Sequence, residues 1–391
     1  MPIDADKALL PAGFADLLPE EANLEATTQA RLMQAFTMRG YERIKPPLLE
    51  FETGLLEGTG AAMSGQTFRL MDPISQRMMG LRADITPQVA RVATSRLAHR
   101  PRPLRLCYTG DVLRVKGGQL RPEREFAQAG IELIGSSAPE ADAEVITTAV
   151  ETLAEIGVAG VAVDLGMPTL VPAVTIDLEV PAEVAARLRI ALDRKDAAAT
   201  AETARRAGTA AERLLPALMA AVGPIEDALK RLEALDLGPA GKVECQRLAA
   251  VAERVAARLP TTPITLDAVE NRGFEYHTGA IFTLFARGVR GELGNGGRYL
   301  AGSGEAAEPA TGVTLFLDTL RRAVPMPEEP RRVLVPADAD STRLAALRAG
   351  GWVTTPALER VSDLAAEARR LGIGHVLDAA GSPHPVPEEG S

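Results

Sequence analysis

The sequence predicts an α+β fold, in which an antiparallel sheet is flanked by helices, and three observations support this prediction. Residues 102–135 contain two strand-like runs on either side of a Gly-rich basic loop, a pattern typical of a β-hairpin. Residues 172–260 are rich in Ala, Leu, Arg and Glu, lack Phe, Trp and Tyr, and repeat apolar residues at helical spacing. After residue 332, short strand-like and helix-like runs alternate, which predicts a small C-terminal α/β unit.

Length and composition limit the classes of protein to which the chain can belong. With 391 residues it can bury a sizeable core and form two or three units. Hydrophobic residues make up 46% and charged residues 24%, as in ordinary globular proteins, and no apolar run approaches the ~20 residues that span a bilayer. The net charge of -9 argues mildly against a nucleic-acid partner, although an acidic protein can still carry a local basic face.

The few cysteines and histidines give no sign of a metal site. Cys107 and Cys245 form no disulfide framework and no zinc spacing, and Cys107 falls on the predicted core face of a strand. The four histidines are scattered along the sequence, so we expect no metal ion. The first residues lack the basic and apolar pattern of a signal peptide, and we expect the protein to be cytoplasmic.

The elements before the hairpin follow from proline, glycine and apolar spacing. A Pro- and Gly-broken loop opens the chain, and helical spacing then predicts a helix over residues 20–39, which a glycine ends. Residues 41–51 predict a strand that a Pro-Pro pair interrupts. Thr86 and Pro87 predict a helix that starts with a hydroxyl cap followed by proline.

The elements after the hairpin complete the predicted order. Residues 137–140, Ser-Ala-Pro-Glu, predict a capping box that starts the next helix, and residues 161–165 predict a short buried strand. The amphipathic helices of residues 170–262 follow. Residues 326–332 predict a linker, and the tail from Ser382 has the composition of a disordered segment.

The hairpin sorts its residues by face when each run is taken as a strand with alternating side chains. Arg, Gln and Glu share one face with glycines and apolar residues, which leaves room above the sheet and polar groups to satisfy. Such a face suits a small zwitterionic ligand better than a core, although the hairpin alone fits solvated positions on a half-exposed sheet equally well. The residues on this face are Tyr108, Gly110, Val112 and Arg114 in the first run, and Phe126, Gln128, Gly130 and Glu132 in the second.

This segment resembles motif 2 of the class II aminoacyl-tRNA synthetases, and specifically that of histidyl-tRNA synthetase. Arg114 matches the signature arginine of the motif, and Gln128 and Glu132 match histidine-pocket residues of that enzyme at the family spacing. The resemblance extends from about Leu10 to Val324, so it covers most of the chain. It implies a synthetase-like antiparallel sheet, a helical insertion within it, and a self-dimer formed through the region that resembles motif 1.

Three further segments resemble the histidine pocket of the synthetase. Residues 81–91, LRADITPQVAR, resemble its LRPEGT run with an Asp in place of Glu. Residues 270–279, ENRGFEYHTG, resemble its RGLDYY signature with a His in place of the second Tyr, and residues 294–300, GNGGRYL, resemble the glycine-rich strand that follows. The resemblance implies a histidine site formed by Asp84, Thr86, Arg114, Gln128, Glu132, Arg272, Tyr276, His277 and Tyr299.

The residues that would handle ATP depart from the synthetase pattern. Motif 2 of the synthetase reads Arg-x-Glu, with the Glu helping to hold ATP, whereas here Lys116 takes that position. In the stretch that resembles motif 3, Asp318 and Thr319 replace a Glu-Arg pair. A neutral hydroxyl cannot supply the charge with which an arginine clamps a phosphate. Another arginine of the same helix could still take over this contact with the phosphate. We expect Arg121 and Arg124, in the hairpin loop, to be solvated or at a partner surface.

The chain keeps the residues that would bind an amino acid but has changed those that would bind ATP. In this it resembles the histidyl-tRNA-synthetase-like regulatory subunits of ATP phosphoribosyltransferase, the first enzyme of histidine biosynthesis. This resemblance implies a chain without catalysis or a cofactor of its own. It would bind free histidine as a feedback effector and activate a short-form catalytic ATP phosphoribosyltransferase subunit in a hetero-octamer, without tRNA or a membrane as partners. Two alternatives remain: a working histidyl-tRNA synthetase with altered ATP motifs, and a repurposed paralogue that binds another amino acid or none.

The expected domains follow from this interpretation. A synthetase-like histidine-binding domain spans residues 1–325 and contains the helical insertion at residues 170–262. A small α/β domain with a disordered tail spans residues 331–391. It is shorter than the anticodon-binding domain of a synthetase, so the part that would read tRNA is reduced.

Overall fold

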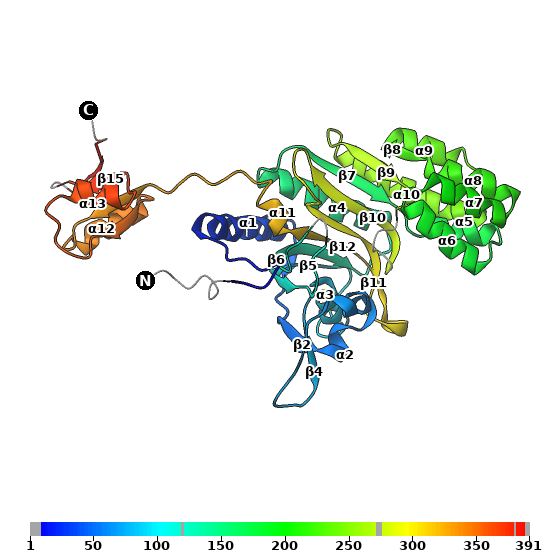
Figure 1. The fold of residues 1–391 in the computed structure, drawn as a ribbon, viewed down its shortest axis with the longest axis horizontal. Helices are drawn as coiled ribbons and strands as arrows, with labels where there is room; N and C mark the ends of the chain where they lie inside the picture. The colour runs from blue at the N-terminus through cyan, green and yellow to red at the C-terminus, as the bar shows by residue number, and fades with distance from the viewer. Residues whose placement is uncertain (1–8, 119–120, 271–275, 379–380, 388–391) are drawn as a thin grey trace. The chain divides into compact units, whose positions relative to one another are not determined.

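The computed structural model describes residues 9–118, 121–270, 276–378 and 381–387. The chain divides into two compact units, Met1–Pro325 and Met326–Ser391, whose folds are drawn in Figure 1. The first unit is built on a large sheet with helices on its faces, and the second on a small sheet with two helices. The α+β class predicted from the sequence is therefore confirmed.

The central sheet of the first unit is antiparallel through its middle and mixed near its ends. Consecutive neighbours from β5 to β7 all pair antiparallel, whereas β1 joins β5 and β9 joins β7 in parallel. In spatial order, the nine strands found among the described residues are β1 (Glu42–Arg43), β5 (Leu104–Leu113), β6 (Glu125–Ile134), β12 (Glu308–Phe316), β11 (Gly294–Ala301), β10 (His277–Ala286), β7 (Val161–Gly166), β9 (Ile264–Asp267) and β8 (Val222–Pro224).

Helices cover both faces of this sheet. Two of them, α1 and α4, pack on one face, while α3 packs on the other face above β6, β11 and β12. A separate three-stranded sheet, in the order β2 (Leu49–Phe51), β4 (Met78–Leu81) and β3 (Arg69–Met71), adjoins α2. The helices of this part are α1 (Pro19–Met38), α2 (Glu52–Leu55), the 3-10 helix η2 (Gly58–Gln66), α3 (Thr86–Thr94), α4 (Pro139–Glu155), the 3-10 helix η3 (Gly304–Ala306) and α11 (Leu317–Leu320).

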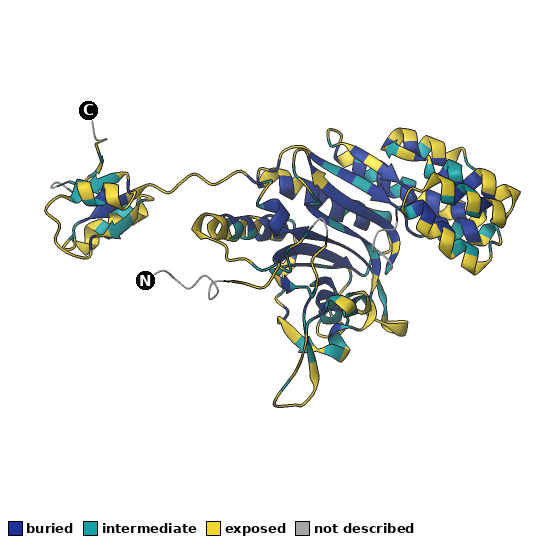
Figure 2. Cartoon of the chain, viewed as in Figure 1, coloured by how far each residue is buried: buried dark blue, intermediate teal, exposed yellow. Residues whose placement is uncertain are grey.

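The alternation of side chains along β6 decides which face carries the core and which carries the polar groups. Ala127, Ala129 and Ile131 belong to the large apolar core beneath α1 and α4. Gln128 and Glu132 lie on the opposite face, beneath α3, as period 2 predicts. Figure 2 shows buried residues running along the central strands, so both faces of the middle of the sheet are covered.

The segment predicted as a helical insertion is a group of amphipathic helices that stays tied to the sheet. A short strand that the sequence does not predict, β8, pairs antiparallel with β9 at Gly223 and Leu266. No helix of the described residues is long and apolar enough to cross a membrane. The helices are α5 (Leu170–Asp177), α6 (Ala182–Asp193), α7 (Ala197–Ala207), α8 (Thr209–Met219), α9 (Ile225–Glu233) and α10 (Gly238–Arg258).

The second unit is a four-stranded sheet with its own small apolar clusters on either side of β13. The sequence predicts a disordered tail from Ser382, but β16 pairs antiparallel with β15 there. Its two prolines lack the N–H that a central strand must donate, and β16 is accordingly an edge strand. The elements are β13 (Arg332–Val335), α12 (Ser341–Ala349), β14 (Val353–Pro356), α13 (Leu364–Arg370), β15 (His375–Leu377) and β16 (Pro383–Pro385).

The capping box predicted at Ser137 is wrong. Helix α4 begins at Pro139, and its cap position is Ala138, which has no side chain that could accept a hydrogen bond. Instead, the guanidinium of Arg298 on β11 donates to the carbonyl oxygens of Ser136 and Ala138, each at 2.9 Å. A tertiary contact therefore replaces the local cap at this helix.

Candidate functional site

The predicted histidine pocket lies between α3 and the face of the sheet formed by β6, β12 and β11. Six of the nine predicted residues line a cavity of ≈ 30 Å³, which is room for about one water molecule or two. Arg114 and Gln128 adjoin this cavity through Asp84, whereas Arg272 lies outside the described residues. The lining residues are Asp84, Thr86, Glu132, Tyr276, His277, Asn295, Gly296, Gly297, Tyr299, Gly312 and Thr314.

Glu132 is the deepest charged group of the pocket. Its side chain is fully buried, and each carboxyl oxygen accepts one hydroxyl hydrogen bond at 2.9 Å, Oε1 from Thr86 and Oε2 from Tyr299. Burial away from water raises the pKa of Glu132 to about 8, although the hydrogen bonds from Tyr299 and Thr86 pull it down. The carboxyl is therefore poised to hold or release a proton near neutral pH.

Hydroxyl groups continue this network behind Glu132. The Tyr108 hydroxyl lies 2.8 Å from Thr314 Oγ1 and 3.2 Å from Thr86 Oγ1, and all three side chains are buried. Burial and the nearby Glu132 carboxyl raise the pKa of Tyr108 well above its ordinary value, so the phenol stays neutral. Sequence reasoning missed Thr314 as a pocket residue, although it lies two residues after Gly312 on the same face of β12.

Glycines on the sheet leave the space that these side chains occupy. A Cβ atom on Gly312 would lie 1.7 Å from Glu132 Oε2, because the glutamate on β6 leans over the neighbouring strand. A Cβ atom on Gly130 would lie 2.4 Å from the Tyr108 hydroxyl. The glycines do leave space above the sheet, as the sequence predicts. The side chains of Tyr108 and Glu132 occupy much of this space.

Asp84 and Gln128 join the start of α3 to the sheet. Asp84 Oδ1 accepts from the Thr86 backbone N–H at 2.9 Å, and Gln128 donates to Asp84 Oδ2 at 3.2 Å. The Gln128 amide oxygen also accepts from the Ile85 N–H at 3.2 Å. Thr86 is therefore the first residue of the helix and not its predicted cap, and its hydroxyl is turned toward Glu132.

Arg114 lies beside Asp84 at the edge of the pocket residues and makes few contacts with the residues that the structure describes. Among the described residues it makes one hydrogen bond, from Nε to the Ala83 carbonyl at 3.3 Å, and one ion-pair contact of 4.0 Å to Asp84. The guanidinium carbon lies 5.0 Å from the centre of the Phe126 ring. Because a guanidinium has five donors, most of those of Arg114 have no partner among the residues that the structure describes.

Aromatic rings form one wall of the pocket. The centres of the Tyr276 and His277 rings lie 4.2 Å apart, and Tyr276 meets Tyr299 edge to face at 6.1 Å. Tyr299 is fully buried, and burial beside Glu132 raises the pKa of its phenol well above the ordinary value. These rings offer flat surfaces to a planar ligand group.

The prediction that Arg121 is solvated or at a partner surface is wrong. Its side chain is 12% exposed, and Nε donates to Asp318 Oδ2 at 2.8 Å. The guanidinium carbon lies 3.7 Å from the centre of the Phe316 ring. Arg124 is also engaged within the protein and donates to the Arg114 carbonyl at 3.2 Å. Both arginines therefore make contacts within the protein.

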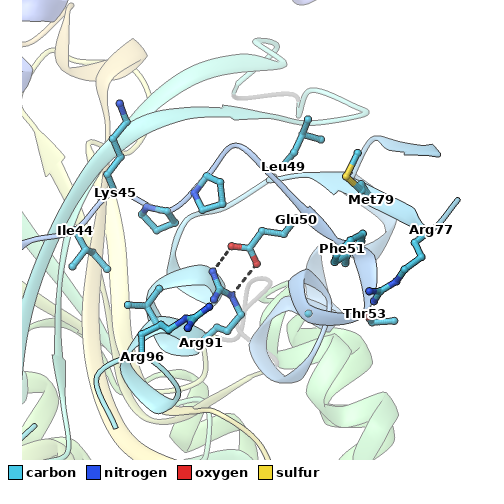
Figure 3. A pocket seen from close by; sticks show the side chains of 14 residues that line it. Ile44, Lys45, Leu49, Glu50, Phe51, Thr53, Arg77, Met79, Arg91 and Arg96 are labelled. Atoms are coloured by element: carbon cyan, nitrogen blue, oxygen red, sulfur yellow. Dashed lines mark hydrogen bonds and ion pairs between the residues drawn. The ribbon is translucent and has the colours of Figure 1, made fainter. Parts of the chain in front are cut away.

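A larger cavity of ≈ 790 Å³ lies away from this pocket, on the segment that resembles motif 1 (Figure 3). Its walls are mostly apolar, and Figure 3 shows Glu50 paired with Arg91 on one side, while Lys45, Arg77 and Arg96 also line the cavity. Arg91 Nε donates to Glu50 Oε2 at 2.9 Å. Its cations and apolar walls lack the buried carboxyl and convergent hydroxyls of the smaller pocket, so size alone does not identify the candidate site.

Known proteins resemble this chain over most of its length. A family model described as histidyl-tRNA synthetase matches residues 13–320. The ATP phosphoribosyltransferase regulatory subunit of Paramagnetospirillum magneticum is 55% identical over 96% of this chain and 98% of its own length. The subunit of the same name from Rhodospirillum rubrum is 52% identical over 97% of each chain.

Solved structures agree with these matches. A Bacillus halodurans protein described as an ATP phosphoribosyltransferase regulatory subunit/histidyl-tRNA synthetase covers 93% of this chain and 96% of its own, with a TM-score of 0.78 and 25% identity. Histidyl-tRNA synthetase from Nostoc sp. PCC 7120 has a TM-score of 0.76 at 19% identity, covering 95% of this chain and 91% of its own, which shows the fold alone. The chain therefore belongs to the histidyl-tRNA synthetase family and, within it, to the ATP phosphoribosyltransferase regulatory subunits.

Proposed function

We propose that this chain binds free histidine in the pocket around Glu132 and thereby regulates a short-form catalytic ATP phosphoribosyltransferase subunit, without catalysis of its own. The observation that carries the proposal is the buried Glu132 carboxyl, held by two hydroxyls, together with the Arg114 guanidinium beside Asp84, which makes one hydrogen bond to the described residues. A donor side chain at one end and a carboxylate at the other are what histidine offers to such a pair.

The chemistry of the side chains assigns a role to each part of the ligand. Arg114 clasps the carboxylate, and Asp84 accepts from the ammonium with help from Thr86 and Gln128. Glu132 pairs with an imidazole N–H, which favours a donor side chain over an apolar one. Tyr276 and Tyr299 wall the ring, with His277 beside them; Arg272, the second cation that the resemblance implies, lies outside the described residues.

The volume of the cavity bears on how a ligand would enter. At ≈ 30 Å³ it holds a water or two, and a whole histidine is larger. Binding therefore requires the side chains above the sheet to move apart, and part of the interaction free energy is spent on that rearrangement. A sensor benefits from such a change, because a ligand shifts an equilibrium only when it binds two states with different affinities.

Several residues support the absence of catalysis. Lys116 and Thr319 stand where the synthetase pattern has a carboxylate and an arginine for ATP. Asp318 is engaged with Arg121 at 2.8 Å, so it too is committed within the protein. We expect the chain to act in the cytoplasm as a self-dimer through the region of Figure 3, joined to catalytic subunits in a hetero-octamer.

A reconstitution experiment tests this function. The chain alone should turn over nothing, a short catalytic subunit alone should form phosphoribosyl-ATP weakly, and mixing them should raise the rate. Histidine should then lower the rate, and Arg114→Ala should shift the inhibition curve by about tenfold to a hundredfold in histidine, because a lost hydrogen bond to a charged group costs roughly 1.5–3 kcal/mol.

The matched control for this variant is Arg187→Ala, which removes an exposed guanidinium that pairs with its neighbour Glu183 on the surface of α6. Both variants should assemble with the catalytic subunit, as measured by gel filtration. An inhibition curve that stays in place for Arg114→Ala would put the histidine sensor on the other subunit.

A working histidyl-tRNA synthetase is the second candidate, because the matching family model carries that description. It makes the opposite prediction for one assay. If the chain is regulatory, histidine-dependent exchange of pyrophosphate into ATP should equal that of a blank without enzyme. Loss of the charged groups that hold the phosphates of ATP commonly lowers the rate by orders of magnitude. Exchange well above that blank would replace the regulatory proposal with the synthetase.

A further inference from the structure

The ≈ 790 Å³ cavity of Figure 3 is lined by more positive than negative side chains, in a chain whose net charge is -9. Its volume lies within the roughly 300–1,000 Å³ that is typical of ligand sites. Among the described residues that line it, the one carboxylate is that of Glu50. The cations are Lys45, Arg77, Arg91 and Arg96. This leaves an excess of positive charge at the cavity.

Glu50 offsets only one of these cations. Both of its carboxyl oxygens accept from the Arg91 guanidinium, with Oε2 at 2.9 Å from Nε, and Oε1 also accepts from the Gln88 amide at 2.9 Å. The side chains of Lys45 and Arg96 form no hydrogen bond and no ion pair with the residues that the structure describes. These two cations are therefore left for a partner that the chain itself does not supply.

A stacked arginine and apolar side chains complete the walls of the cavity. The guanidinium carbon of Arg77 lies 3.7 Å from the centre of the Phe51 ring, which is a stacking contact. Stacking occupies the face of a guanidinium and leaves the N–H groups at its edge to bind an anion. Ile44, Leu49 and Met79 are among the apolar residues of the walls. The cavity thus combines cations with surface for a less polar body.

Two buried side chains hold one wall of the cavity in place. Arg82 donates to the Pro46 carbonyl at 3.0 Å, and Gln88 donates to the Pro47 carbonyl at 2.7 Å. Arg82 is 6% exposed and Gln88 is 1% exposed. Because the two prolines also have fixed backbone angles, this wall needs little ordering when a ligand binds, and less of the binding free energy is spent on it.

We propose that this cavity binds a small anion with several negative charges, of the class of phosphorylated compounds, through Arg96, Lys45 and Arg77. Cations without carboxylate partners bind phosphate oxygens well, and several of them together favour a multiply charged anion over a single carboxylate. A self-dimer formed through this region would bring the cations of two copies close together, and a bound anion would offset their repulsion. The cavity shares no lining residue with the pocket around Glu132, so the inference does not depend on histidine binding.

The test is titration calorimetry of the full-length chain with inorganic pyrophosphate, without divalent metal and at low salt, where interactions between charges are least screened. The unchanged chain should bind pyrophosphate. Arg96→Ala should bind it at least about tenfold more weakly, because a hydrogen bond to a charged group is lost. Lys45→Ala should weaken binding by about threefold, since an ammonium group makes no bidentate contact.

The matched control is Arg213→Ala on α8, which removes another exposed arginine that has no ion pair among the described residues. It should leave the affinity for pyrophosphate unchanged. A loss as large as that of Arg96→Ala would indicate general attraction by surface charge and would overturn the inference. Arg96 is exposed as well, so both variants should keep the fold, which circular dichroism checks.

Three further outcomes decide against the site. The inference is wrong if the unchanged chain binds no pyrophosphate, or if Arg96→Ala binds it as tightly as the unchanged chain. It is also wrong if saturating histidine displaces pyrophosphate, because that result would put the anion in the smaller pocket. Histidine titrations without pyrophosphate report separately on the proposed function.

Discussion

Glu132 shows how one buried residue ties the pocket to the stability of the whole chain. Its pKa rises from an ordinary value of 4.5 to about 8 because the carboxyl is fully buried. Between these two values the folded chain holds a proton that the unfolded chain has released. The contribution of this group to stability is therefore complete below pH 4.5 and is lost as pH rises through 8.

The pH dependence of unfolding should report this coupling. The free energy of unfolding should fall by an amount on the order of 4 kcal/mol between pH 4.5 and pH 9 on account of Glu132, at 1.36 kcal/mol per unit of pKa shift. Glu132→Gln should lack this component, so the difference between variant and unchanged chain should grow with pH in urea titrations. Glu20→Gln, at the exposed start of α1, serves as control, and a difference independent of pH would contradict the assigned burial.

Gly312 sets a second constraint at the scale of single residues. Gly312→Ala should abolish tight histidine binding, because the added methyl group would lie 1.7 Å from Glu132 Oε2 and push the carboxyl out of place. Overpacking of this kind also costs about 1–3 kcal/mol of stability. The control is Gly65→Ala in η2, where no atom lies within 4 Å of the new Cβ. Calorimetry with histidine should separate the two variants, and equal affinity would remove Glu132 from the site.

At the scale of elements, helix α4 is fastened to the sheet by a buried ion pair. Arg298 on β11 meets Asp142 on α4 at 2.7 Å, and their side chains are 12% and 5% exposed. Burial raises the pKa of Asp142, while Arg298 and Thr311 lower it. The same arginine holds the turn before the helix, so α4 starts where the sheet requires it and not where a local cap would place it.

Removing one partner of this pair should be costly. Asp142→Ala leaves Arg298 buried without its carboxylate and should lower the free energy of unfolding by about 3–5 kcal/mol. Glu140→Ala removes an exposed acid of the same helix that pairs with Arg254, and should cost much less, because exposed ion pairs add little to stability. Urea unfolding of both variants measures the contrast. Similar losses in the two would mean that the buried pair adds little to the attachment of α4.

Elements also show why some contacts could be predicted and others not. The faces of β5 and β6 could be predicted because side chains alternate along any strand, and in the structure Tyr108 pairs with Gly130 on one of these faces. The burial of Arg121 could not, because Asp318 lies 197 residues further along the chain. The caps of α3 and α4 were mispredicted for a related reason: groups held by tertiary contacts displaced the local signals at Thr86 and Ser137.

At the scale of the whole molecule, the chain consists of two units with separate cores. The first has a large core around its sheet, and the second has small clusters around Val333, Val335 and Leu334. The α+β class could be predicted from periodicity, whereas the strand β8 and the strand at Pro383–Pro385 could not, because three residues are too few to show alternation.

The first unit should therefore carry histidine binding by itself. A chain that ends at Pro325 keeps all the described residues of the pocket and its supporting core. It should bind histidine with the affinity of the full chain within about twofold, measured by calorimetry, and melt at a similar temperature. A loss of binding in a truncated chain that remains folded would assign the second unit a direct part in the site.

The glycines beneath the pocket have a consequence for redesign. Alanine is ordinarily the mildest replacement in a mutational scan, yet at Gly130 and Gly312 a single methyl group would collide with Tyr108 and Glu132. Both positions are therefore closed to every side chain as long as those two residues keep their places. A library meant to turn the pocket toward another amino acid should keep these two glycines and vary other residues that line the cavity, such as Asp84 and Asn295.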